Sequence, residues 1–303
     1  MKMKIKKLKK EVLHLSIFIN SVIFFYFLKA MPIFTYKTIS RFLGVLSFAF
    51  MGSTKKRIIN NLKISYGDKF SLEERKEIGK DIFSNIVFSF CELVGTTKLN
   101  TQQIIDMAEI EGEEILKSAL KTGKGVVGVC SHMGNFPLLQ YILVKKGYPA
   151  NVIIKAPSAS LFAKFCDKLI RGAGVTYISK QNARKTITEA QDWMAANRGV
   201  LSFYLDQHAS NGTPTQFFGK KVFAPNGAAL FAKKYNCLAL GIFSYRMKSG
   251  KHKIIIEGPY PLKETNNINE DLIANTSYFM ERVEHYVKAA PEQWFSWLHR
   301  RFR

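Results

Sequence analysis

The stretch 125–137, GVVGVCSHMGNFP, decides how the central part of this chain is expected to fold. Its first six residues are glycine, valine and cysteine, and β-branched valines favour a buried β-strand. A polar turn that contains His132 follows, and Pro137 is typical of the first turn of a helix. The stretch therefore predicts a strand, a short turn and then a helix.

The same order of short apolar strand and longer helical segment recurs along the chain. The candidate strands are 125–131, 151–155, 175–179, 200–206 and 237–244. The helical segments that separate or follow them are 137–146, 158–171, 182–197 and 226–235. Strands that alternate with helices form parallel sheets. We therefore predict an α/β domain with a mostly parallel central sheet flanked by helices.

The segments before and after this alternation complete the expected domain. A hairpin of 243–248 and 251–257 is expected to add an antiparallel edge to the sheet, and helices at 268–289 and 291–299 are expected to close the chain. Ser71 and Glu74 form a capping box at the start of a long helix that ends near Gly95. No linker composition interrupts the chain, so residues 51–303 are predicted to be one domain.

Composition excludes several classes of protein. The chain has 303 residues, 47% hydrophobic and 22% charged, which excludes a disordered, collagen-like or disulfide-scaffold protein. The four cysteines, Cys91, Cys130, Cys166 and Cys237, form no CxxC pair and lie among apolar neighbours, so we expect them to be reduced and buried. The sequence has no P-loop, GxGxxG or GxSxG motif and no metal-site spacing. Metal ions and cofactors are therefore not expected.

Basic charge is concentrated at the N-terminus. The net charge is +22, and residues 1–63 hold 13 of the 45 Lys and Arg residues but one acid, Glu11. Six lysines precede the apolar run 12–28, and a second, weaker apolar stretch covers 33–50. Lysines beside an apolar helix favour an anionic membrane surface. We therefore predict that residues 1–50 form a helical membrane anchor.

Four interpretations of this N-terminus remain open at the level of sequence. The first run is short for a spanning helix, which needs about 20 apolar residues. A single span, a pair of helices lying in the membrane interface, and the core helix of a soluble protein all fit the pattern. A cleaved signal peptide fits the basic start but lacks an A-x-A-like cleavage site.

His132 and Asp206 are the candidate catalytic residues. Each follows a predicted parallel strand, and ligands bind beyond the carboxyl ends of such strands. An imidazole at this edge can act as a general base, and a carboxylate beside it can orient the ring and stabilise its protonated form. The alternative roles are structural: a histidine that caps a turn, and an aspartate at a helix or turn start.

Four blocks of sequence resemble one known family. They are KKRIINNLKISYG at 55–67 with the long helix that follows, SHMGNFPLL at 131–139, YLDQHASNGTPTQFFGKKVFAPNGAALFAKK at 204–234 and PEQWFSWLHRRFR at 291–303. Together they resemble the late acyltransferases of lipid A biosynthesis, the lauroyl/myristoyl transferases within the lysophospholipid acyltransferase superfamily. The likeness runs through nearly the whole chain in the same order.

This resemblance implies an O-acyltransferase at the cytoplasmic face of the bacterial inner membrane. The acyl donor would be acyl carrier protein or acyl-CoA, and the acceptor a hydroxyl of a lipid A precursor or a related membrane glycolipid. A histidine at the position of His132 would deprotonate the acceptor, which attacks the thioester directly. No covalent acyl-enzyme, metal or cofactor is implied.

The chain departs from the family motif at one position. The family places an acid five residues after the histidine, and here that residue is Pro137. We expect Asp206 to orient His132 instead, with Glu92 as the weaker candidate. The alternative is a catalytically inactive, membrane-bound lipid-binding protein. A nucleic-acid partner is not expected, because the charge gathers at the membrane-like end and no nucleic-acid-binding motif is present.

Five further residues are candidates for substrate binding. Asn135 would contact the thioester carbonyl or cap the turn, and Arg171 would bind a phosphate or be a solvated helix-end residue. Gln207 follows Asp206 at the same strand end. Phe218 and Gly219 are expected to form a wall of the acyl pocket with a close backbone approach.

Overall fold

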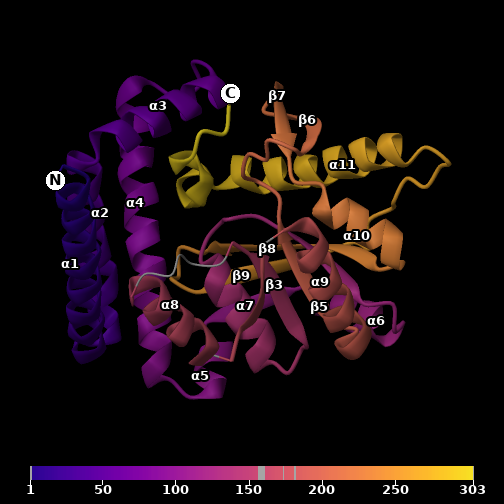
Figure 1. Cartoon of the computed structure of the whole chain (residues 1–303), viewed down its shortest axis with the longest axis horizontal. Helices are drawn as coiled ribbons and strands as arrows, with labels where there is room; N and C mark the ends of the chain where they lie inside the picture. Colours follow the sequence, from indigo (N-terminus) through magenta and orange to yellow (C-terminus); the bar gives the residue numbers. More distant parts are fainter. Residues whose placement is uncertain (1, 156–160, 173, 181, 303) are drawn as a thin grey trace.

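The structure is a computed structural model that describes residues 2–155, 161–172, 174–180 and 182–302. Within its helices, the side chains of residues 2–10, 13, 14, 17, 162, 163, 166 and 183 lie outside that description, so the expected burial of Cys166 does too. The other three cysteines are buried and free. The described chain is a mixed α/β protein around one large sheet (Figure 1).

Seven strands form the sheet, in the order β1-β9-β8-β2-β5-β3-β4. All neighbouring pairs are parallel except β8 and β9. A separate antiparallel hairpin pairs β6 with β7. The strands are β1 Ala108–Glu111, β2 Val126–Cys130, β3 Ala150–Ile154, β4 Thr176–Ser179, β5 Val200–Tyr204, β6 Thr213–Phe217, β7 Lys220–Ala224, β8 Leu238–Arg246 and β9 His252–Glu257. The predicted mostly parallel α/β sheet is therefore confirmed.

Helices follow the strands as the alternation predicts. They are α1 Lys2–Ala30, α2 Tyr36–Phe50, α3 Gly52–Tyr66, α4 Leu72–Gly95, α5 Thr101–Ile105, α6 Glu113–Lys121, α7 Phe136–Lys145, α8 Leu161–Gly172, α9 Ala183–Asn197, α10 Gly227–Tyr235 and α11 Ile268–Ala289. Short 3-10 turns occupy Ile33–Thr35, Thr96–Lys98, Pro291–Gln293 and Phe295–Leu298.

Two expectations about local structure were wrong. The β8–β9 hairpin forms, but it is not at the sheet edge, because β1 pairs in parallel along the outer side of β9. A short, acid-containing strand such as β1 (AEIE) gives no apolar pattern to detect. The expected last helix, 291–299, is two 3-10 turns on either side of Trp294, which has an extended backbone.

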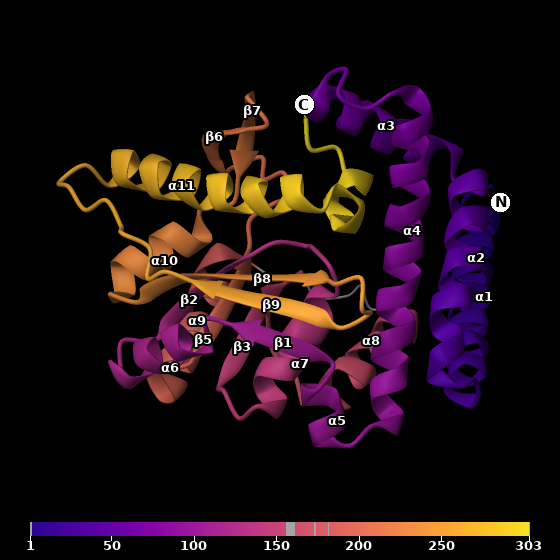
Figure 2. The same cartoon turned by 180° about the vertical axis from the view of Figure 1, so that it is seen from behind.

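The two faces of the sheet bury alternate residues of each strand. Val127 and Val129 of β2 pack into the core under α9, α10 and α11, whereas Val126 and Cys130 pack into the core under α6 and α7. This period of two is the geometry of a strand covered on both faces. Figures 1 and 2 show α10 and α11 on one side of the sheet and α6 and α7 on the other.

The long helix α4 stands at one end of the sheet and carries α1 and α2 on its outer side (Figures 1 and 2). Gly44 of α2 allows this close packing, because a Cβ there would lie 2.4 Å from the backbone of Ser84 in α4. Among the described residues, no single helix is long and apolar enough to cross a bilayer, whereas the pair Phe18–Ala30 and Ile33–Phe50, bent by 119°, reaches that length and composition together.

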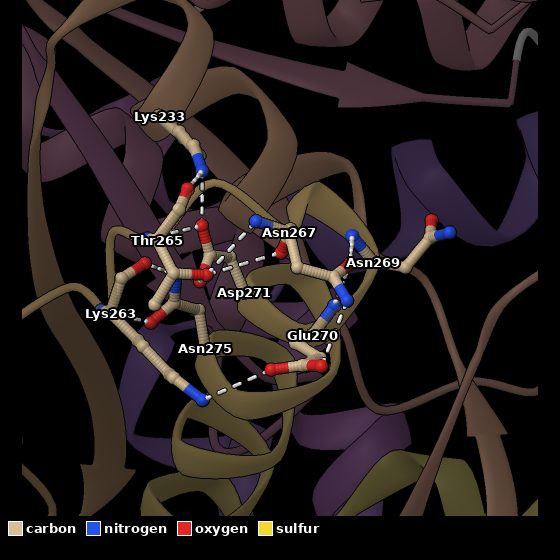
Figure 3. Close-up of polar contacts among 8 residues, drawn as sticks. All are labelled: Lys233, Lys263, Thr265, Asn267, Asn269, Glu270, Asp271 and Asn275. Atoms are coloured by element: carbon tan, nitrogen blue, oxygen red, sulfur yellow. Dashed lines mark hydrogen bonds and ion pairs between the residues drawn. The ribbon is translucent and has the colours of Figure 1, made fainter.

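Polar side chains fix the start of α11 against α10 (Figure 3). Asn267 caps the helix by accepting bonds from the backbone N–H groups of Asn269 and Glu270. The carboxylate of Asp271 pairs with Lys233 of α10 and accepts hydrogen bonds from Thr265. These contacts hold α10 and α11 together in the layer that covers one face of the sheet.

Candidate active site

His132 and Asp206 meet at the carboxyl end of two neighbouring strands. His132 lies two residues beyond the end of β2 and Asp206 two residues beyond the end of β5. Because β2 and β5 are parallel and Cys130 is paired with Tyr204, both residues emerge at the same edge. The Nδ1 atom of His132 lies 2.7 Å from Oδ1 of Asp206, and the backbone N–H of His132 donates to Oδ2 at 2.9 Å.

Asp206 is fully buried and has two more hydrogen-bond donors. The indole Nε1 of Trp294 donates to its Oδ2 at 2.7 Å, and the hydroxyl of Ser296 donates to the same oxygen at 3.0 Å. Burial would raise the pKa of Asp206, but the charge of His132 and the hydrogen bonds from His132 and Trp294 outweigh it and lower the pKa to about 2. Asp206 is therefore an ionised carboxylate, and it accepts a hydrogen bond from a proton that stays on Nδ1 of the imidazole.

With Nδ1 engaged, Nε2 is the atom of His132 that can accept a proton. The side chain is 18% exposed, and the amide nitrogen of Gln207 lies 3.4 Å from Nε2. Aromatic rings surround the imidazole: Phe136 at 4.8 Å, Tyr204 at 4.7 Å and Phe295 at 6.4 Å between ring centroids. The dyad thus sits in a largely apolar setting with one nitrogen available.

An apolar cavity of about 190 Å³ lies next to this site. Phe136 and Phe295, whose rings contact His132, also line the cavity, so these two rings lie between the cavity and the imidazole. The other lining residues come from α4, from the start of α7 and from the C-terminal segment: Ile82, Asn85, Ile86, Ser89, Phe90, Leu93, Gly134, Pro137, Gln293 and Trp294. A hydrocarbon chain is the kind of ligand that such a lining accepts.

An imidazole with a carboxylate at Nδ1 lies beside an apolar cavity. The comparison with known families shows which class of protein carries this arrangement. A family model described as bacterial lipid A biosynthesis acyltransferase matches residues 5–303. The chain belongs to this acyltransferase family. No curated protein sequence matches it.

Asn135 stabilises the local structure of the candidate site. Its carboxamide oxygen caps α7 by accepting from the backbone N–H of Leu138 at 3.2 Å. Its amide donates to Glu92 Oε2 at 2.8 Å and to the backbone oxygen of Ser89 at 3.2 Å, and the residue is fully buried. These bonds occupy the side chain, so the capping role is the one that its contacts favour.

Glu92 does not contact His132. It pairs instead with Arg246 and His252 in a buried cluster between α4 and the β8–β9 hairpin. Burial would raise the pKa of Glu92, but hydrogen bonds and charge from His252 and Arg246 outweigh it and lower the pKa. The sequence analysis named Asp206 and Glu92 as candidate partners of His132. In the structure, the carboxylate beside the imidazole is that of Asp206.

Arg171, Phe218 and Gly219 are not joined to the dyad by any contact among the described residues. Arg171 is exposed on α8, where it pairs with Asp167 at 2.8 Å and lies over the ring of Tyr177. Phe218 and Gly219 form the β6–β7 turn with left-handed φ values of 52° and 67°. Phe218 packs on Tyr66 and Trp297 and does not line the cavity.

The sequence interpretation missed two groups of residues in this candidate site. Trp294 and Ser296 lie in the C-terminal block 291–303, and nothing in their spacing indicates a contact with Asp206. The cavity wall on α4 has no motif of its own, because it depends on how that helix packs over α7. Among the described residues, no group of three or more His, Cys, Asp or Glu could hold a metal ion.

Proposed function

We propose that this acyltransferase moves a fatty acyl chain from a thioester, carried by acyl carrier protein or coenzyme A, to a hydroxyl of a lipid A precursor or a related membrane glycolipid. The observation that carries the proposal is the 2.7 Å bond between His132 Nδ1 and Asp206 Oδ1 beside an apolar cavity. It supports a general base with a fixed tautomer next to a space for an acyl chain.

In the proposed mechanism, Nε2 of His132 takes the proton from the acceptor hydroxyl. The resulting oxygen nucleophile attacks the thioester carbonyl carbon and forms a tetrahedral intermediate. That intermediate collapses to the ester as the C–S bond breaks, and the leaving thiolate takes the proton from Nε2. Asp206, held ionised by its hydrogen bonds, stabilises the imidazolium while it exists.

The acyl chain is proposed to lie in the cavity between α4 and the start of α7. Ile82, Ile86, Phe90 and Leu93 supply an apolar wall from α4. Pro137, which replaces the acid of the family motif, belongs to the same lining. An uncharged residue at this position suits a hydrocarbon, since an unpaired carboxylate in an apolar cavity would be costly. Gln207, beside Nε2, is proposed to contact the reacting groups.

Residues 1–50 are proposed to attach residues 51–303, the acyltransferase domain, to the cytoplasmic face of the bacterial inner membrane. Large apolar side chains of α1, α2 and the 3-10 turn between them are exposed, among them Ile23, Tyr26, Phe34, Phe42 and Phe50. The lysine-rich start of the chain adds attraction to anionic headgroups of about 1 kcal/mol per lysine. Acyl carrier protein, the glycolipid and the membrane surface are all proposed as anionic partners of this basic chain.

The test is transfer by the purified full-length chain in nanodiscs. A ¹⁴C-labelled acyl group is supplied on acyl carrier protein or on coenzyme A in separate arms, and the lipid A precursor is analysed by mass spectrometry. A mass increase of one acyl chain on the lipid supports the proposal, and the faster arm identifies the donor. Lipid binding without transfer in either arm would support the inactive lipid-binding alternative. An acyl group found on the protein would contradict direct transfer.

A further inference from the structure

The carboxylate of Asp206 accepts hydrogen bonds from other groups besides the imidazole of His132. Its Oδ2 accepts from the backbone N–H of His132, from Trp294 Nε1 at 2.7 Å and from Ser296 Oγ at 3.0 Å. Its Oδ1 faces His132 Nδ1. The last torsion of an aspartate side chain is broad, so the strand alone does not fix the plane of its carboxylate.

We infer that Trp294 and Ser296 are positioning residues for acyl transfer, which hold Oδ2 of Asp206 so that Oδ1 stays aligned with Nδ1 of His132. The inference rests on the proposed role of His132 as general base. Both residues are fully buried, and neither contacts the imidazole through a polar atom in the described structure. They act on the base through Asp206.

The segment that carries these two donors is tied to the turn that carries the base. The backbone N–H of Phe295 donates to the carbonyl of His132 at 2.8 Å, and that of Gly134 donates to the carbonyl of Gln293 at 3.0 Å. Met133 and Trp294 form an isolated antiparallel bridge. This short ladder therefore places the turn of His132 relative to Trp294 and Ser296, and the side-chain bonds from those two residues tie Asp206 to the same segment.

Trp294 offers a substitution with a matched control. Trp294→Phe keeps an aromatic ring in the core and removes the N–H that reaches Asp206. Trp297→Phe makes the same change at an equally buried residue, whose Nε1 donates to the carbonyl of Pro291 at 2.8 Å. The two indoles contact each other at 4.5 Å between ring centroids, so their packing environments are similar. Ser296→Ala removes the second donor with a smaller change in volume.

We expect Trp294→Phe and Ser296→Ala each to lower kcat by about ten- to a hundredfold, the equivalent of one hydrogen bond to a charged group. KM for the acyl donor should stay nearly constant in Ser296→Ala, because Ser296 does not line the cavity, and in Trp294→Phe the lining keeps an aromatic ring. Trp297→Phe should keep the kcat of the unsubstituted protein. An equal fall in kcat in Trp297→Phe would overturn the inference, since it would mean that core packing alone matters.

A second measurement does not depend on turnover. ¹⁵N NMR of the full-length chain in detergent, with labelled histidine, reports which nitrogen of His132 carries the proton, and His132→Ala assigns the signal among the six histidines. We expect one tautomer, with hydrogen on Nδ1, in the unsubstituted protein, and a mixture of tautomers in the Trp294→Phe/Ser296→Ala double variant. A single Nδ1–H tautomer in the double variant, with unchanged kcat, would overturn the inference.

The outcomes separate this inference from the proposed function. If His132→Ala keeps full turnover, the proposed base is wrong, and the NMR signal still decides whether Trp294 and Ser296 orient the dyad. If His132→Ala is inactive but the Trp294 and Ser296 variants keep their turnover and tautomer, only the positioning role is wrong. Circular dichroism of each variant shows whether it is folded, and Ser296→Ala, the smallest change, carries the test if Trp294→Phe unfolds.

Discussion

His132 and Asp206 are 74 residues apart in the sequence, yet their side chains meet at an Nδ1–Oδ1 distance of 2.7 Å. The carboxylate reaches the imidazole from the neighbouring parallel strand. The family motif would instead take an acid from the first turn of the helix after the histidine, where this chain has Pro137. In this chain, the carboxylate beside the imidazole thus comes from the position after β5, because the motif position holds Pro137.

Asp206→Asn should lower kcat by about a hundredfold or more, since the amide cannot hold the imidazole in the same tautomer or stabilise its positive charge. Steady-state acyl transfer with the better donor measures the change. Asp271→Asn, which removes a buried carboxylate paired with Lys233 at the start of α11, is the control and should keep the kcat of folded protein. Equal turnover in Asp206→Asn would assign the orienting role to another group.

The pKa of Asp206 also predicts how stability depends on pH. Its value is lowered from 3.8 to about 2 in the folded protein. The unfolded chain therefore binds the proton first, and ionised Asp206 contributes about 2 kcal/mol of stability above pH 4. This contribution is lost as the pH falls from about 4 to about 2.

Unfolding of the detergent-solubilised protein between pH 2 and pH 7 checks this prediction. The difference in unfolding free energy between the unsubstituted protein and Asp206→Asn should shrink below pH 4, because the Asn variant lacks the titrating group. A difference that stays constant down to pH 2 would contradict the low pKa.

Pro137→Glu restores the acid of the family motif, and we expect it to lower kcat/KM by about tenfold or more. Asp206 already occupies Nδ1 of His132, so the new carboxylate would enter the apolar cavity that Pro137 lines. Pro137→Ala keeps the lining uncharged and serves as the control. Faster transfer by Pro137→Glu than by Pro137→Ala would show that the motif acid works here as well.

Membrane attachment is expected to depend on the exposed apolar side chains of α2. Phe42 and Phe50 are 67% and 81% exposed. Replacing both with Glu should reduce binding to phosphatidylglycerol vesicles by at least about tenfold, because burial of each ring contributes about 1.5–3 kcal/mol. Vesicle sedimentation measures the bound fraction. Leu72→Glu, an exposed apolar residue at the start of α4, should bind normally, and unchanged binding of the double variant would place the attachment elsewhere.

The sequence predicts the buried central strands of the sheet better than the edge strand β1 and the separate β6–β7 hairpin. Strand β2 is apolar on both faces, so GVVGVC identifies it without knowledge of its neighbours. Strand β1 is exposed on one face and contains two glutamates, and β6 contains Pro214, so neither has a strand pattern. The pairing of β1 also depends on β9, far along the chain, whereas β6 pairs with β7, the next strand.

One part of the candidate site could likewise be predicted from the sequence, and the other part could not. The common edge of His132 and Asp206 follows from the rule that parallel strands end together. Trp294 and Ser296 are 88 and 90 residues from Asp206 and reach it from irregular turns, whose path no periodicity describes. Arg171 had a helix-end position that suits phosphate binding, but the side chain pairs with Asp167. The sequence does not show which of several nearby side chains an exposed arginine pairs with, and the structure does.

The role of His132 is tested most directly by one substitution in the transfer assay. His132→Ala and, as a control, His285→Ala at an exposed histidine of α11 are compared with the unsubstituted chain for acyl transfer to a lipid A precursor. The account predicts that His132→Ala loses transfer by about a hundredfold or more while it stays folded, and that His285→Ala transfers normally. Transfer by folded His132→Ala at the unsubstituted rate would contradict it.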